Sequence, residues 1–334
     1  MESPPAPFAS ERRSLPCRSE GAGAHDTFPR VRAWDAEITL DEELVRELLV
    51  EQFPDLDASS ARPLAEGWDN AVWIVEERWA FRFPRRAVAA PLVDRELAVL
   101  PRLAPLLPVP VPIPRFVGRP SERFHWPFFG CPLLPGREPA DAGLTDDERV
   151  ELGAALGGFL RVLHASETRE LLDPGRQLPV DPNRRADMTA RVQIARRWLA
   201  ELESLGSWRA HEGVERLLDS ALGLGPAHAE AVVHGDLHMR HVLVDGGALS
   251  GVIDWGDICR ADPAVDTSLV WSFLSPAGRE AFMREYGPVG EEQALRARVL
   301  AVALCAALAV YGRRKGHPSL ERESLAGIER TMLD

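Results

Sequence analysis

The sequence predicts an α+β fold in two lobes, a small β-rich N-lobe and a larger, mostly helical C-lobe. Residues 71–75 and 79–83 are two β-rich runs separated by a short polar turn, which predicts a hairpin. From Thr145 onward, apolar residues recur at helical spacing over long stretches. A Pro-Gly segment lies between the two patterns. We therefore place the N-lobe at 34–131, a hinge at 132–137 and the C-lobe at 138–334.

The helices and strands expected in the N-lobe follow from helix-capping residues and from prolines that interrupt regular structure. Thr39 with Glu42 predicts a capping box ahead of a first helix, because apolar residues then recur at helical spacing. A helix carrying Glu96 should follow the hairpin. The proline-rich run 105–114 predicts an extended path, since proline fixes φ and removes amide donors. Further strands are expected around 116–118 and 127–134.

The C-lobe begins with a second capping box, Thr145 with Glu148, ahead of a long apolar helical pattern. Several helices should follow it, with three short strands framing polar turns near the middle of the lobe. The expected helices are 185–205, 208–223 and the last part of the chain, and the expected strands are 231–233, 242–244 and 251–253.

Composition narrows the class of protein. The 334 residues include 45% hydrophobic residues, and the formal charge is −12, which argues against a general affinity for nucleic acid. The four cysteines show no metal-binding or disulfide-framework spacing, so a reducing, cytoplasmic location is expected. Residues 1–33 lack a secretory apolar stretch and are interpreted as a disordered leader.

The apolar run from Val299 to Tyr311 is shorter than the ~20 residues that a membrane span requires, so it predicts a buried helix and no membrane association. Charge is uneven between the lobes. Residues 1–137 carry a net charge of −3 and residues 138–334 a net charge of −9. This difference favours a cationic ligand on the C-lobe, although a solvated acidic surface gives the same count.

The densest polar cluster is His234-Gly-Asp236-Leu-His238-Met-Arg240-His241, held between two of the predicted strands. Asp254 follows the next strand, in Gly251-Val-Ile-Asp-Trp-Gly-Asp257. In kinase-type phosphoryl transfer, one carboxylate accepts the proton of the attacking hydroxyl. A residue five positions later and a carboxylate on the next hairpin hold Mg²⁺. Asp236, His241 and Asp254 have this spacing.

These motifs resemble those of the aminoglycoside phosphotransferase family, small-molecule kinases with a protein-kinase-like fold. The resemblance covers roughly residues 35–330. It is carried by His234-Gly-Asp-Leu-His238, Gly251-Val-Ile-Asp-Trp-Gly-Asp257, Ala261-Asp-Pro-Ala-Val-Asp266, Glu66-Gly-Trp-Asp-Asn70, Trp79-Ala-Phe-Arg-Phe-Pro-Arg-Arg86, Glu96 and Leu133-Leu-Pro-Gly136.

The resemblance implies transfer of the γ-phosphate of ATP or GTP to a hydroxyl of an aminoglycoside-, macrolide- or metabolite-like molecule. It makes Asp236 the catalytic base and Asp254 the main Mg²⁺ ligand. Arg82 occupies the strand position that contacts nucleotide phosphates, and Glu96 would pair with it.

The remaining implied roles concern the nucleotide and the support of the catalytic loop. Leu133 and Leu134 lie in the segment expected to meet the base of the nucleotide, and Gly67 in the loop that covers its phosphates. Asp262 and Asp266 are expected to support the catalytic loop.

Two positions depart from the family pattern. His241 stands where the second metal ligand is usually Asn, and since Mg²⁺ prefers oxygen ligands, this change weakens the site or favours Mn²⁺. Arg82 stands where a kinase-like lobe often has lysine, and the only lysine in the sequence is Lys315. Arginine keeps the charge but changes the geometry of the phosphate contact.

Two alternatives remain open. The histidines His234, His238 and His241 are candidate ligands of a zinc-dependent hydrolase, although Gly235 stands where an HExxH motif has Glu. A catalytically impaired pseudokinase that acts as a nucleotide-binding module also agrees with His241. The oligomeric state is not predicted.

Overall fold

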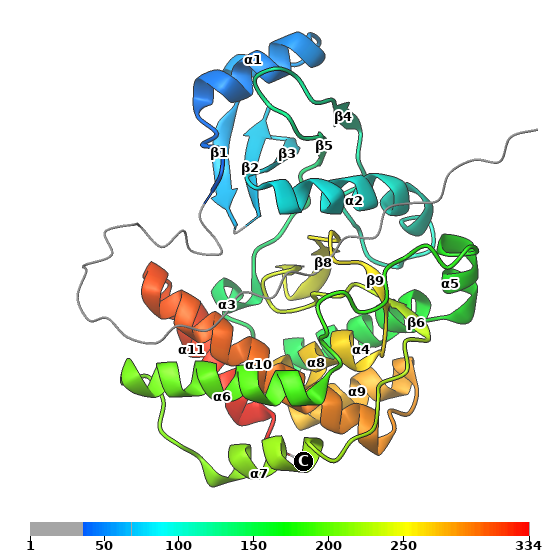
Figure 1. Cartoon of the computed structure of the whole chain (residues 1–334), viewed down its shortest axis with the longest axis vertical. Helices are drawn as coiled ribbons and strands as arrows, with labels where there is room; N and C mark the ends of the chain where they lie inside the picture. Colours follow the sequence, from blue (N-terminus) through cyan, green and yellow to red (C-terminus); the bar gives the residue numbers. More distant parts are fainter. Residues whose placement is uncertain (1–35, 68, 334) are drawn as a thin grey trace, which may run out of the picture. The chain divides into compact units, whose positions relative to one another are not determined.

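The structure is a computed structural model that describes residues 36–67 and 69–333. The leader predicted at 1–33 lies outside the described residues. From residue 36 on, the chain has the predicted α+β character, with a five-stranded antiparallel sheet in the N-lobe and a mostly helical C-lobe (Figure 1).

The N-lobe sheet has the strand order β1-β2-β3-β5-β4. Its strands are β1 (Arg62–Glu66), β2 (Asn70–Val75), β3 (Trp79–Pro84), β4 (Phe116–Gly118) and β5 (Phe128–Pro132). The predicted hairpin is β2 and β3, which pair in register from Asn70↔Pro84 to Val75↔Trp79. Strand β1 was not predicted, because all five of its residues are exposed and show no apolar alternation.

Two helices flank this sheet, α1 (Glu42–Gln52) and α2 (Ala90–Leu103), with 3₁₀ turns η1 (Ala58–Ser60) and η2 (Ala87–Ala89). The predicted cap of α1 is wrong: Asp41, not Thr39, caps the helix, and its carboxylate accepts a hydrogen bond of 2.8 Å from the amide of Leu44. An acceptor directly before the first helical residue satisfies that free amide, and Thr39 lies too early in the chain to do so.

The C-lobe contains nine helices among the described residues. They are α3 (Pro139–Ala142), α4 (Asp146–Leu163), α5 (Ser166–Leu172), α6 (Met188–Ser204), α7 (Glu212–Ala221), α8 (Ala264–Phe273), α9 (Pro276–Tyr286), α10 (Glu291–Lys315) and α11 (Pro318–Arg330). The capping box of Thr145 and Glu148 at the start of α4 is confirmed. Thus the second half of the chain is helical, as its periodicity predicts.

Four short strands lie at the upper side of the C-lobe, under the N-lobe sheet (Figure 1). Strand β6 (Ala231–Val233) pairs with β9 (Cys259–Ala261), and β7 (Val242–Asp245) pairs with β8 (Ala248–Val252). The predicted third strand at 251–253 is shifted, because β8 begins at Ala248 and ends before Ile253. The polar turns after β6 and β8 are the segments that carry the motifs.

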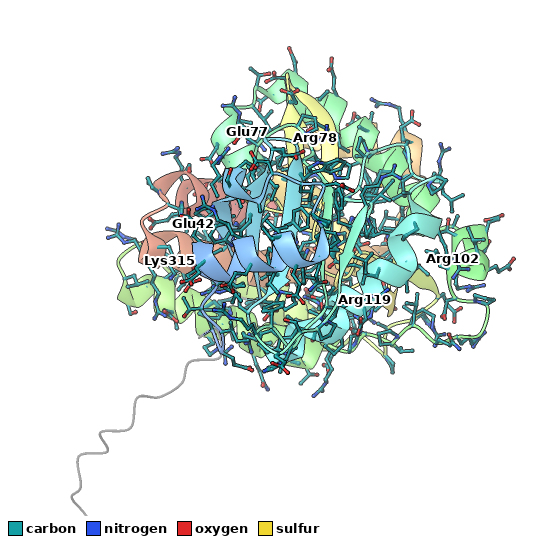
Figure 2. The ribbon with its side chains drawn as sticks, turned by 90° about the horizontal axis from the view of Figure 1, so that it is seen from above. Glu42, Glu77, Arg78, Arg102, Arg119 and Lys315 are labelled. Atoms are coloured by element: carbon teal, nitrogen blue, oxygen red, sulfur yellow. The ribbon has the colours of Figure 1, made fainter. Side chains whose placement is uncertain are left out.

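Helix α10 is the one helix in the described part of the chain that is long and apolar enough to span a membrane by length and composition. Most of its apolar stretch is buried, and it packs against α6, α8 and α11. The buried helix predicted around 299–311 is therefore confirmed as part of a longer one. Lys315, at its C-terminal end, is exposed (Figure 2).

Candidate active site

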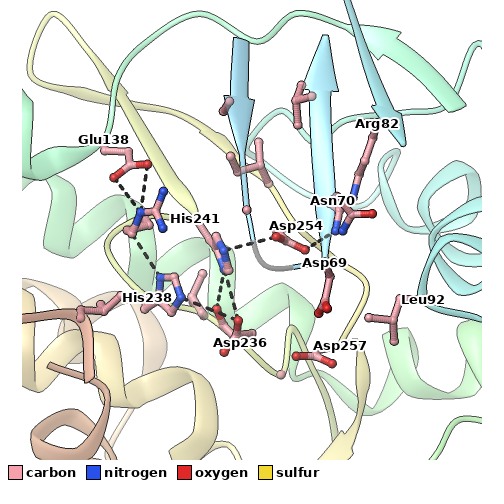
Figure 3. Close-up of a pocket in the computed structure, with 18 of the residues that line it drawn as sticks. Asp69, Asn70, Arg82, Leu92, Glu138, Asp236, His238, His241, Asp254 and Asp257 are labelled. Carbon is pink, nitrogen blue, oxygen red and sulfur yellow. Dashed lines mark hydrogen bonds and ion pairs between the residues drawn. The ribbon is translucent and has the colours of Figure 1, made fainter. Parts of the chain in front are cut away.

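A cavity of about 1280 Å³ lies between the N-lobe sheet and the C-lobe. Its walls come from the first three strands, the hinge, the loop after β6, and helices α6 and α10. Figure 3 shows the carboxylates and histidines that meet in it. Of the predicted site residues, Gly67, Arg82, Leu133, Leu134, Asp236, His241 and Asp254 all line this cavity.

Arg82 joins the two lobes. Its guanidinium lies 3.1 Å from Oε1 of Glu96 on α2 and 2.5 Å from Oδ1 of Asp254 in the C-lobe. Glu96 is fully buried and also accepts a hydrogen bond of 2.9 Å from the amide of Trp255. The predicted pair of Arg82 and Glu96 is therefore present, and it extends to Asp254.

Asn70, at the start of β2, completes this cluster. With its amide oxygen turned toward Arg82, it accepts hydrogen bonds of 2.8 Å from Nη2 and 3.2 Å from Nε. Asn70 is the last residue of the motif Glu66-Gly-Trp-Asp-Asn70, and the motif alone predicts no role for it. In the hairpin register Asn70 lies opposite Pro84 and Arg82 lies opposite Val72, so Asn70 and Arg82 are diagonal neighbours on adjacent strands.

The two carboxyl groups bound to Arg82, those of Glu96 and Asp254, have pKa values shifted in opposite directions. Burial raises the pKa of Glu96 to about 7, although Arg82 acts in the opposite direction. Burial also acts to raise the pKa of Asp254, but the charges of Arg82 and then His241 outweigh it and hold that pKa well below its usual range. Asp254 therefore remains a carboxylate over the whole physiological range.

Asp254 has a left-handed backbone, with φ of 64°. A non-glycine residue in this region costs free energy and persists only where the surroundings enforce it. Here the backbone on either side is fixed, because Ile253 donates to the carbonyl of His241 at 2.9 Å and Trp255 donates to Glu96. This conformation turns the carboxylate of Asp254 toward the cavity (Figure 3).

Asp266 fixes the loop that carries Asp236. Its buried carboxylate accepts hydrogen bonds from the amides of His234 (2.7 Å) and Gly235 (3.0 Å). Gly235 has a φ of 90°, and a Cβ there would lie 2.2 Å from the carbonyl oxygen of Asp257. Asp266 therefore supports the loop as expected, whereas the carboxylate of Asp262 accepts a hydrogen bond of 2.8 Å from the amide of Ala264, the first residue of α8.

Asp236 lies on this loop and is held by an arginine that the sequence analysis missed. Nη2 of Arg185 lies 2.8 Å from Oδ1 of Asp236 and 2.7 Å from Oδ2 of Asp257. Burial opposes ionisation of Asp236, but Arg185, followed by His238 and His241, lowers its pKa well below the usual range. One oxygen of Asp236 is thus fixed by Arg185 while the other faces the histidines.

Arg185 is positioned by a turn ahead of α6. The carboxylate of Asp181 accepts hydrogen bonds from the amides of Arg185 (2.7 Å) and Ala186 (2.8 Å), and Asp181 itself donates to the carbonyl of Arg260 on β9. No motif marks this segment in the sequence. It precedes Asp236 by about fifty residues, so only the tertiary fold brings the two together.

The three histidines do not form one cluster. His234 is fully buried, and its two ring nitrogens are bound to backbone, one to the carbonyl of Ile253 at 3.0 Å and one to the amide of Asp236 at 3.3 Å. His238 and His241 instead stack with ring centroids 3.9 Å apart, beside Asp236. The predicted zinc set is therefore wrong in one member, because both nitrogens of His234 are already used.

The donor atoms around His241 suit a divalent cation. Nε2 of His241 lies 3.4 Å from Oδ2 of Asp254, and ligand atoms of Asp236, His238 and His241 lie within 4.8 Å of one another. Nδ1 of His241 bonds the carbonyl of Asp236 at 2.8 Å, which fixes the ring and directs Nε2 toward Asp254. A mixed nitrogen and oxygen set of this kind suits Mn²⁺ as well as Mg²⁺.

The other end of the cavity has apolar walls from the sheet and the hinge. Val72, Ile74 and Leu133 line it from the N-lobe, and Leu243 and Ile253 from below. The amide of Leu133 bonds the carbonyl of Arg78 at 2.8 Å, which ties the hinge to the β2–β3 turn. Leu134 packs against Gly251, where a Cβ would lie 3.0 Å from its side chain. The lining of this end of the cavity, the apolar slot, is therefore apolar on both sides.

Gly67 lies in the turn between β1 and β2, at the cavity wall, where its amide bonds the carbonyl of Asn70 at 2.8 Å. Asp69 in the same turn is paired with Arg86 at 2.8 Å. Gly67 and Asp69 therefore line the same cavity as Arg82.

Comparisons with known proteins agree with this geometry. A sequence profile described as "Phosphotransferase enzyme family" matches residues 60–299. No curated protein matches the chain significantly.

Among solved structures, the kanamycin and GDP complex of APH(2")-IIia is 23% identical with a TM-score of 0.64, covering 85% of this chain and 97% of that one. The GDP complex of aminoglycoside 2'-phosphotransferase-IIIa is 21% identical with a TM-score of 0.64 (88% and 99% covered). The macrolide 2'-phosphotransferase MphH from Brachybacterium faecium is 21% identical with a TM-score of 0.57 (86% and 98% covered). These likenesses show a shared fold.

Proposed function

This chain belongs to the phosphotransferase enzyme family, and from that premise we propose that it transfers the γ-phosphate of ATP or GTP to a hydroxyl group of a small molecule. The observation that carries the proposal is the convergence of Asp236, Asp254 and Arg82 in one cavity that also has an apolar slot. A phosphoryl transfer needs a carboxylate at the nucleophile, a metal-binding carboxylate and a cation at the phosphates. Each is present on a different element.

In this proposal the base of the nucleotide lies in the apolar slot beside Leu133 and Leu134, and its phosphates extend past Gly67 toward Arg82. Glu96 holds Arg82 in place from below the sheet. A divalent metal, Mg²⁺ or Mn²⁺, would be held by Asp254 and His241. When bound, the metal supplies positive charge that offsets the charge of the phosphates.

Asp236 orients the acceptor hydroxyl. Because Arg185 fixes Oδ1, Oδ2 is the oxygen available to the hydroxyl hydrogen. As the hydroxyl oxygen bonds to the γ-phosphorus, the bond from that phosphorus to its bridging oxygen breaks, and the nucleoside diphosphate leaves. The hydroxyl proton passes to Asp236 late in this step, and the lowered pKa of Asp236 keeps it ionised until then. Positioning and electrostatics supply most of the rate gain.

The test is a thermal-shift titration of the full chain with ATP and GTP, each with Mg²⁺, Mn²⁺ or EDTA. We expect metal-dependent stabilisation of a few degrees at saturating nucleotide. Asp254→Ala should lose the metal-dependent part, and Asp94→Ala on the exposed side of α2 is the matched control. Lack of stabilisation by either nucleotide contradicts the proposal. Stabilisation without phosphate transfer to any acceptor or to water indicates a nucleotide-binding pseudokinase.

A further inference from the structure

Helix α10 presents an apolar stripe to the cavity. The stripe consists of Leu300, Ala303, Leu304, Ala307, Leu308 and Tyr311. Their spacing of three and four residues places them on one face of the helix. The stripe becomes less buried from Leu304 onward, where the side chains are half-buried rather than covered by other elements. The apolar surface that α10 does not bury in the core therefore faces the cavity.

Helix α6 presents a second apolar face to the same space. Ile194 and Trp198 are one helical turn apart, both half-buried, and both line the cavity. The helices α6 and α10 pack against each other, so the two faces form one wall. Since the cavity also contains Asp236, this wall borders the space where the acceptor hydroxyl must lie.

The carboxylates of the cavity are already paired with arginine. Asp236 and Asp257 bind Arg185, and Asp254 binds Arg82. Glu138 lies 3.2 Å from Arg240 (Figure 3). On the N-lobe side, Asp69 pairs with Arg86 and Glu66 lies 3.4 Å from Arg85. Among the described lining residues, then, every carboxylate has an arginine partner, and a polycation entering the cavity finds none without one.

Two arginines of α6 line the cavity without a carboxylate in ion-pair distance. Arg191 is half-buried and bonds only the carbonyls of Arg184 and Asn183. Burial, with the charge of Arg185, lowers the pKa of Arg191. Arg197 lies over the ring of Trp198 at 5.3 Å. The wall formed by α6 and α10 is therefore apolar with an excess of positive charge.

We propose that the acceptor of the phosphate is an apolar, hydroxyl-bearing molecule that is neutral or anionic, and that it lies against α6 and α10. This inference rests on the proposed function. It replaces the expectation of a cationic acceptor, which counted charges over the whole C-lobe. Each carboxylate at the cavity has an arginine partner, with Arg185 shared by Asp236 and Asp257, and the arginines of α6 add positive charge beside the apolar wall. A polycation would leave the apolar stripe in contact with water and face two unpaired arginines.

The test is ligand binding to the full chain without nucleotide. The probe is 1-anilinonaphthalene-8-sulfonate, an apolar anion that fluoresces in apolar sites. The competitors are cholate, an apolar hydroxylated anion, octyl glucoside, an apolar neutral alcohol, and kanamycin, a polycation. We expect the probe to bind and both cholate and octyl glucoside to displace it, whereas kanamycin does not. Tighter binding of kanamycin than of cholate, measured by calorimetry, overturns the proposal.

Two variants locate the site. Leu304→Asp introduces a charge into the stripe and should weaken probe and cholate binding by more than about tenfold. The matched control is Leu222→Asp, an exposed leucine outside the cavity. If Leu304→Asp and Leu222→Asp bind the probe and cholate with equal affinity, an acceptor site on α10 is contradicted.

Arg197→Gln should weaken cholate by about two- to fivefold and leave octyl glucoside unchanged, with the exposed Arg209→Gln as control. Unchanged cholate affinity in Arg197→Gln contradicts the proposal that the arginines of α6 attract an anionic acceptor. A parallel titration of the wild type with ATP and GTP separates the two proposals. Absence of nucleotide binding contradicts the proposed kinase function, while the affinities for cholate, octyl glucoside and kanamycin still decide the class of the acceptor.

Discussion

Two arginines organise the cavity, and each joins two carboxylates. Arg82 connects Glu96 with Asp254, and Arg185 connects Asp236 with Asp257. The first cluster crosses from the N-lobe to the C-lobe, whereas the second lies within the C-lobe. The proposed metal and phosphate side of the site therefore depends on how the lobes meet, while the proposed base, Asp236, is fixed within one lobe.

The two clusters also differ in their response to pH. In the Arg82 cluster, burial raises the pKa of Glu96 to about 7, so its folded-state pKa lies above the unfolded one. Its contribution to stability is therefore present below about pH 4.5 and is lost as the pH rises toward 7. Beside Asp236, burial and the neighbouring His241 lower the pKa of His238 to about 3. The lowered pKa of His238 has the opposite effect on the free energy of unfolding, because stability is then lost as the pH falls.

The largest effect is expected from Arg82→Gln, which removes the cation between two carboxylates. Leaving Glu96 and Asp254 without their partner should lower the free energy of unfolding by about 3 kcal/mol and abolish measurable nucleotide binding. Arg82→Lys keeps the charge and is the matched control. Chemical denaturation and nucleotide titration measure both quantities. Normal nucleotide affinity in Arg82→Gln would mean that this cluster has a structural role only.

Arg185→Gln should separate the second cluster from the first. We expect kcat for nucleotide hydrolysis to fall by about a hundredfold while the nucleotide Kd stays unchanged, because Arg185 contacts Asp236, the proposed base, and not the apolar slot. The pKa of Asp236 should rise toward its usual value, and the acidic limb of the pH–rate profile should therefore shift to higher pH. A fall in nucleotide affinity equal to the fall in kcat would contradict the division between the clusters.

His241→Asn probes the contact between the clusters, since His241 faces both Asp236 and Asp254. An amide oxygen in place of imidazole should shift the metal preference from Mn²⁺ toward Mg²⁺ by roughly tenfold in half-saturating concentration. Metal titrations of the nucleotide complex measure the change, with His211→Asn outside the cavity as control. An unchanged ratio of the half-saturating concentrations of Mn²⁺ and Mg²⁺ would show that His241 is not a metal ligand.

The smallest effect is on acid stability. A lowered pKa of His238 means that the unfolded chain binds the extra proton below about pH 6.5, so stability is lost as the pH falls from 6.5 toward 3. His238→Gln should flatten this loss by up to about 1.4 kcal/mol per pH unit. Denaturation midpoints at pH 6.5, 5.5 and 4.5 measure the slope. A slope identical to that of the wild type would contradict the buried neutral state of His238.

Most of the fold could be predicted because its signals are local. The β2–β3 hairpin follows from two runs and a turn, and the start of α4 from Thr145 and Glu148. The errors also have local causes. Strand β1 has no buried face, and β9 is only three residues long, with a register that is set by its partner β6.

The motif residues Asp236, Asp254 and Arg82 line one cavity, and Glu96 pairs with Arg82, so the sequence indicated which of these side chains lie close together, while their roles stay predictions. Arg185 escaped prediction because a turn anchored on Asp181 and β9 brings it to Asp236, and neither contact has a sequence signal. The charge of the acceptor stays a prediction from the sequence. Pairing with arginine is a property of the folded cavity, and a count along the chain does not show it.

The central claim is that Asp236 carries the chemistry while nucleotide binding depends on the Arg82 cluster. Phosphate release from γ-labelled ATP or GTP to water tests it directly, because no acceptor needs to be known. With Mg²⁺ or Mn²⁺, the wild type should hydrolyse nucleotide slowly, and Asp236→Asn should lose this activity by more than about a hundredfold while binding nucleotide with unchanged Kd. Equal hydrolysis rates in the two proteins would contradict the account.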